Sequence, residues 1–125
     1  MAATVNQPLI LALETSGSCG SVALVDGGGC RAEHSLQSSR THSRRLLEAV
    51  ARLLAECEVE WPQLDGVAVG LGPGSFTGLR IGLSSAKGLV LAIGKPLLGI
   101  SSLDALAGQC LPSPYPLCAL IDARK

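Results

Sequence analysis

Residues 9–36, LILALETSGSCGSVALVDGGGCRAEHSL, decide the fold because they hold three strand-like runs separated by two turns. Residues 9–14 and 21–26 are apolar and β-prone, and the small residues between them favour a hairpin. The glycines at 27–29 predict a second turn, after which residues 30–36 can return as a third strand. The opening of the chain therefore predicts three antiparallel strands.

A helix is predicted next, over residues 42–58. Apolar side chains recur at helical spacing along one side: Leu46, Val50, Leu53 and Cys57. Thr41 is a suitable N-cap. The remaining surface, including Leu47 and Leu54, is also apolar, which indicates a second contact surface besides the one on the sheet.

The rest of the chain alternates short apolar strands with helical stretches. Strands are predicted at 66–71, 96–100 and 117–121, and helices at 76–93 and 101–109. In the longer helix Gly78, Gly82 and Ala86 form a stripe of small residues, so we expect another backbone to pack closely there.

The predicted order is β-β-β-α-β-α-β-α-β. It describes an α/β fold whose mixed sheet has three antiparallel strands followed by parallel crossovers. This is the layout of a ribonuclease-H-like lobe, as found in the actin, Hsp70 and sugar-kinase superfamily.

Composition bounds the class of protein. Hydrophobic residues make up 47% of the 125-residue chain and charged residues 16%, which excludes a disordered tail. We expect residues 1–125 to form a single lobe. Ten basic and ten acidic side chains cancel, so the chain lacks the broad positive field with which proteins hold nucleic acid. An RNA substrate would therefore be held mainly by another protein.

Cysteine usage and the apolar segments indicate a cytoplasmic protein. The cysteines form no CxxC pair and are expected to be buried, reduced thiols: Cys19, Cys30, Cys57, Cys110 and Cys118. No signal peptide is recognisable at the N-terminus. The apolar stretch 79–93 carries Arg80 and Lys87, which argues against a membrane span.

The turn after the first strand is a candidate cofactor-binding site. Glu14, Thr15, Ser16 and Gly17 combine a carboxylate with small residues whose backbone N–H groups can approach phosphate oxygens. The same composition suits any β-hairpin turn. Both interpretations stay open, and no cofactor is assigned.

Two further features have structural and functional interpretations. The glycine-rich turn at 72–80, GPGSFTGLR, can bind an anion or simply allow tight packing, and it matches neither a P-loop nor a nucleophile elbow around Ser75. Arg80 and Lys87 share one helix face, which is either solvated or paired with a partner.

His34 and His42 lack neighbouring ligands at metal spacing, so no metal site is expected.

Four segments together resemble the TsaB (YeaZ) family, which takes part in forming threonylcarbamoyl on adenosine 37 of tRNA. They are LILALETSGSCGSVAL (9–24), RTHSRRLL (40–47), GPGSFTGLRIGLSSAKGLVLAIGKPLLGISSLDALA (72–107) and LIDAR (120–124). The family's opening has Asp where this chain has Glu14, which weakens a metal-binding role. Family members are longer, so the resemblance implies that this chain is the N-terminal lobe without the second lobe.

The resemblance also implies a non-catalytic role. The related catalytic family, TsaD, shares the glycine-rich turn and the helix that follows it, and carries two metal-binding histidines on the next helix, at the positions of Ser102 and Leu106 here. Neither side chain replaces imidazole as a ligand. The resemblance implies docking onto a TsaD-type subunit, or onto a second copy, in a complex with a TsaE-type ATPase, while tRNA is contacted only indirectly.

The helices that resemble the docking elements of TsaB proteins are 42–58 and 76–93. The expected interface residues are Leu46, Leu47, Val50, Leu54, Arg80, Leu83 and Lys87. The alternative function is an actin-like, nucleotide-hydrolysing ATPase that uses Glu14. A metalloprotease-like function would need bound metal.

Overall fold

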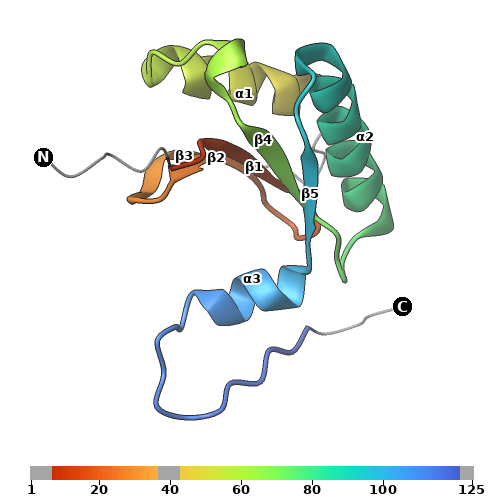
Figure 1. Ribbon diagram of the computed structural model, residues 1–125. Helices are drawn as coiled ribbons and strands as arrows, with labels where there is room; N and C mark the ends of the chain where they lie inside the picture. The colour runs from red at the N-terminus through yellow and green to blue at the C-terminus, as the bar shows by residue number, and fades with distance from the viewer. Residues whose placement is uncertain (1–6, 37–42, 122–125) are drawn as a thin grey trace, which may run out of the picture.

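The computed structural model describes residues 7–36 and 43–121, and its core is a five-stranded mixed sheet (Figure 1). The strands are β1 (Ile10–Glu14), β2 (Gly20–Asp26), β3 (Gly29–Leu36), β4 (Gly66–Gly70) and β5 (Leu97–Ile100). Their order across the sheet is β3-β2-β1-β4-β5. β1 pairs antiparallel with β2 and parallel with β4, so the first strand lies at the centre.

The helices follow the strands in the predicted order. They are α1 (Ser43–Glu56), a short 3-10 turn η1 (Trp61–Gln63), α2 (Phe76–Ile93) and α3 (Ser102–Gly108). Ser75 caps the N-terminus of α2, and Gly94 ends the helix in the left-handed conformation at φ 68°. The predicted Thr41 cap and His42 lie outside the described residues.

One face of the sheet carries the hydrophobic core. Alternate residues of the three central strands are buried beneath α1 and α2: Leu11, Leu13, Val22, Leu24, Val67 and Val69. In α1 they meet Leu46, Val50 and Leu53, each with 0% of its surface exposed. Both long helices lie on this side of the sheet, whereas α3 lies beyond the end of β5 (Figure 1).

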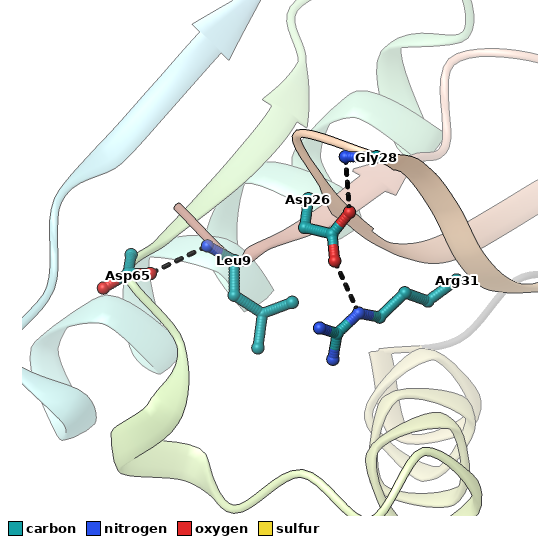
Figure 2. A network of polar contacts seen from close by, with 5 residues as sticks. All are labelled: Leu9, Asp26, Gly28, Arg31 and Asp65. Carbon is teal, nitrogen blue, oxygen red and sulfur yellow. Dashed lines mark hydrogen bonds and ion pairs between the residues drawn. The ribbon is translucent and has the colours of Figure 1, made fainter. Parts of the chain in front are cut away.

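The turn between β2 and β3 is fixed by one carboxylate. Asp26 accepts hydrogen bonds from the Gly28 backbone N–H at 2.8 Å and from Nε of Arg31 at 2.6 Å (Figure 2). The Gly28 N–H and then the Arg31 side chain lower the pKa of Asp26 below its usual value. Asp65 holds the start of β1 in the same way, accepting from the Leu9 N–H at 2.7 Å.

Two sequence predictions about the fold are wrong. Residues 117–121 are not a strand: the chain leaves the sheet after β5, and within residues 7–36 and 43–121 this segment pairs with no strand. The cysteines are free, but they are not uniformly buried. Cys57 is partly buried and the other four are exposed; Cys30, for instance, lies on the outermost strand β3.

Candidate functional site

The carboxyl ends of the parallel strands meet at one edge of the sheet, as this topology requires. β1 ends there at Glu14, β4 at Gly70 and β5 at Ile100. Residues that follow these strands bring a carboxylate, two serine hydroxyls and a glycine-rich turn together. We call this group the strand-end cluster; its members are Glu14, Ser16, Gly72 and Ser102.

The hydroxyl of Ser102 is the centre of the strand-end cluster. It lies 3.1 Å from Oε2 of Glu14, to which it donates, and 3.1 Å from Oγ of Ser16. It also accepts the Gly72 N–H at 3.1 Å. One donor and two acceptor positions are all that a hydroxyl offers, so these three contacts satisfy it when Ser16 donates to it.

Glu14 is held within its own turn. Its Oε1 accepts the Ser16 backbone N–H at 2.9 Å while Oε2 accepts from Ser102. The carboxylate is half-buried, and a Cβ added to Gly70 would overlap it. The cluster therefore offers one carboxylate whose two oxygens already have partners in the chain.

The glycines of the 72–82 segment are used for close packing. Added Cβ atoms at Gly74 and Gly78 would overlap the carbonyl oxygens of Ser16 and Thr15, and one at Gly82 would overlap Oγ1 of Thr15. Oγ1 of Thr15 donates to the Gly78 carbonyl at 2.6 Å. The predicted stripe of small residues thus meets the turn that follows β1, which supports the packing interpretation of these glycines.

The remaining predicted site residues are placed as follows. Gly17 is exposed at the tip of the first turn, and Leu106 is exposed on α3. His34 contacts Glu56 at 2.9 Å. Within residues 7–36 and 43–121, no group of three His, Cys, Asp or Glu side chains is arranged to hold a metal ion.

The outward side of α1 and α2 forms a second candidate site. We call it the helix face and define it by Leu47, Phe76, Arg80, Leu83 and Lys87. A hollow of 430 Å³ on it is lined by Ser43, Thr77, Arg80, Ile81, Leu83, Ser84 and Lys87. A second hollow of 430 Å³ extends it past Leu47, Ser85 and Leu89.

The helix face differs from the predicted interface in its α1 residues. Leu46, Val50 and Leu54 are at most 3% exposed and belong to the chain's own core, so they offer no surface to a partner. Leu47 is 40% exposed and points outward. Apolar periodicity grouped Leu46, Val50 and Leu53 on one side of the helix, and this is the side that packs on the sheet; of the remaining surface, Leu47 is exposed whereas Leu54 is buried.

The helix face also contains residues that sequence reasoning missed. Phe76 is 74% exposed and lies beneath the Arg80 guanidinium, 5.7 Å from its ring centre. Ser85 is buried, and its hydroxyl has no hydrogen-bond partner among the described residues. The sequence signal for Phe76 was its position at the first turn of α2, four residues before Arg80.

The surface of α2 is unusually apolar for a helix at the outside of a domain. Among the described helices it alone has the length and hydropathy of a membrane span, with a mean hydropathy of 1.3 over 18 residues, 17% of which are buried. Core helices of soluble proteins can have the same length and hydropathy. In this structure α2 packs on β4 and α1 and is part of the same lobe.

Comparison with known proteins gives consistent results. The TsaD family model, tRNA N6-adenosine threonylcarbamoyltransferase, matches residues 33–125. The TsaB protein of Haemophilus influenzae, a tRNA threonylcarbamoyladenosine biosynthesis protein, is 39% identical over 117 residues, covering 92% of this chain and 49% of the relative. This chain thus spans about half the length of that curated relative.

Solved structures agree with the fold. YeaZ from Pseudomonas aeruginosa superposes with a TM-score of 0.76 at 40% identity, covering 82% of this chain and 48% of that one. RuvC of Thermus thermophilus superposes with a TM-score of 0.54 at 13% identity, a likeness of fold alone. Together with the sheet order, these neighbours confirm the ribonuclease-H-like, actin-like fold.

Proposed function

The chain belongs to the TsaB (YeaZ) family, and from that premise we propose that it is a non-catalytic subunit of the tRNA N6-threonylcarbamoyladenosine machinery. Its role is to bind and stabilise a TsaD-type catalytic subunit. The observation that carries this proposal is the helix face, where exposed apolar side chains and two hollows lie side by side on α1 and α2. Exposed apolar surface of this kind marks protein contacts.

The strand-end cluster supports a non-catalytic role. Its one carboxylate, Glu14, is engaged by Ser16 and Ser102. Ser102 and Leu106 occupy the positions at which the family resemblance places the metal-binding histidines of TsaD. A serine that ties three strand ends together is a structural residue, whereas a metal ligand needs a donor free to coordinate.

The wider assembly follows from the same premise. We propose that a TsaE-type ATPase joins the complex, that tRNA is contacted only indirectly because the chain has no net charge, and that the protein is cytoplasmic. A homodimer through the helix face is the competing assembly. The 125 residues would be the N-terminal lobe of a two-lobed protein, consistent with their coverage of about half of the relatives.

An actin-like ATPase is the second candidate function. It is favoured by the position of Glu14 at the carboxyl end of a central strand, beside the glycine-rich turn. The backbone N–H groups of Ser16, Ser75 and Gly78 oppose it, because they already donate to Oε1 of Glu14, the Ser16 carbonyl and the Ser75 hydroxyl, respectively. Tight Mg-ATP binding that Glu14→Ala abolishes would support the ATPase.

Complex formation tests the proposed function. The purified chain is mixed with the TsaD-type subunit of the same organism and analysed by size-exclusion chromatography with light scattering. We expect a heterocomplex that Leu47→Asp disrupts, because this substitution places a charge on the apolar helix face. Separate elution of the wild-type chain and subunit would contradict the proposal.

A further inference from the structure

The two helices that carry the helix face are positively charged, although the whole chain is neutral. α1 has Arg44, Arg45 and Arg52 against Glu48 and Glu56, and α2 has Arg80 and Lys87 without an acidic residue. The two helices together thus carry five basic and two acidic side chains, whereas the whole chain has ten of each. The positive charge is concentrated on α1 and α2.

The basic residues of α2 have no ionic partner among the described residues. The ion pairs found there join Arg31 to Asp26, His34 to Glu56 and Arg44 to Glu48. Both acidic residues of α1 are therefore already engaged. Arg80 and Lys87 are exposed and line one hollow, whose other lining side chains, among the residues that the structure describes, are apolar or carry hydroxyls.

The spacing of Arg80 and Lys87 along α2 suits a partner that is itself a helix. Seven residues make two turns of an α-helix, or about 10.5 Å along its axis, and bring both side chains to the same side. Phe76 lies beneath the Arg80 guanidinium and restricts its direction. A second helix laid against α2 would meet Arg80 and Lys87 with residues of its own that are also two turns apart.

Resting on the proposed function, we propose that the helix face selects a partner helix that carries two carboxylates about two turns apart, at the separation of Arg80 and Lys87. Apolar side chains between those carboxylates fill the hollow beside Leu83. The carboxylates neutralise cations that docking removes from water, a step that is costly for an unpaired charge. An entirely apolar partner face would leave both cations unpaired.

A second copy of this chain fits the helix face less well. Contact of α2 with α2 across a two-fold axis brings cations against cations, and like charges at an interface are strongly unfavourable. Nucleic acid also fits less well, because Leu47, Phe76 and Leu83 make the surface between the charges apolar. The charge pattern therefore favours a different, acidic protein partner over self-association.

The test measures the affinity of the chain for the TsaD-type subunit at low and high salt by calorimetry. The double variant Arg80→Glu with Lys87→Glu is compared with Lys95→Glu, a reversal beyond the end of α2. We expect the double reversal to weaken binding about tenfold or more at low salt and less at high salt, and Lys95→Glu to change it less than about twofold. Circular dichroism and a thermal melt check that each variant is folded.

The outcomes separate this inference from the proposed function. If the complex forms and Leu47→Asp disrupts it while the double reversal does nothing, the docking surface stands and the carboxylate partner is wrong. If the wild-type chain forms no complex, the proposed function itself fails. If the chain instead binds itself or tRNA, and the double reversal abolishes that binding, then Arg80 and Lys87 serve another partner and the inference is overturned. Restored binding with the partner's carboxylates changed to lysine would support it directly.

Discussion

The Ser102 hydroxyl lies 3.1 Å from Oε2 of Glu14, which ties the first residue of α3 to the last residue of β1 across most of the chain. With its contacts to Ser16 and Gly72, it joins the ends of three neighbouring strands. The edge where α/β proteins commonly bind ligands is here closed by internal hydrogen bonds. The exposed apolar side chains of the helix face, Leu47 and Phe76, lie elsewhere, on α1 and α2.

Replacing Ser102 tests whether this network stabilises the fold. Ser102→Ala leaves the Gly72 N–H and one Glu14 oxygen without their partner, so we expect the free energy of unfolding to fall by about 1–3 kcal/mol. Urea denaturation measures it. Ser84→Ala is the matched control, because the Ser84 hydroxyl bonds only to its own helix; equal effects of the two substitutions would show that the network contributes nothing.

Replacing either of two glycines of α2 by alanine is expected to change the stability of the fold, in opposite directions. Gly78→Ala places a Cβ against the Thr15 carbonyl oxygen, whereas Gly88→Ala meets nothing within 4 Å. Gly88→Ala should therefore raise stability by up to about 1 kcal/mol through helix propensity, and Gly78→Ala should lower it. Thermal unfolding of both variants is the measurement, and a stabilised Gly78→Ala would contradict the close packing.

Asp26 should make stability depend on acidic pH. Its pKa is lowered below 3.8 in the folded chain, chiefly by the Gly28 N–H, so its contribution is present above that value and is lost as the pH falls through the folded pKa. Asp26→Asn should flatten the decline in stability below about pH 4. Chemical denaturation at a series of pH values checks this, and unchanged pH dependence would rule out the role.

Substitutions of two neighbouring leucines of α1 should separate effects on stability from effects on docking. Leu46 is 0% exposed and Leu47 is 40% exposed. Leu46→Ala should cost about 2–5 kcal/mol of stability, while Leu47→Asp should change stability by less than about 0.5 kcal/mol and still disrupt the complex with the TsaD-type subunit. Denaturation and binding measured on the same preparations distinguish the two.

The sequence predicted the local elements well because they depend on nearby residues. The 9–36 segment folded as three antiparallel strands, and α2 has the predicted bounds. The prediction of a strand at 117–121 was wrong because a strand must also lie beside another strand, and this segment does not pair with the outer strand β5; apolar composition does not reveal that.

The sites were harder to predict because they join distant residues. The role of Ser102 depends on contacts with Glu14 and Ser16, far away in the chain, and no local pattern marks such a hydroxyl. Leu47 and Leu54 both lie outside the apolar stripe of α1, but Leu47 is exposed and Leu54 is buried, because exposure depends on how the whole helix packs in the fold. The positive charge of α1 and α2, by contrast, could be read directly from the residues.

Hydrogen–deuterium exchange of the chain, alone and with the TsaD-type subunit, tests the central claim most directly, because it locates the docking surface without a substitution. We predict slower amide exchange in α1 and α2 on complex formation, with little change in β2, β3 and the turn at Asp26. Protection confined to α3, residues 109–121 or the strand-end cluster, with α1 and α2 unaffected, would contradict the proposal that this protein docks through its helix face.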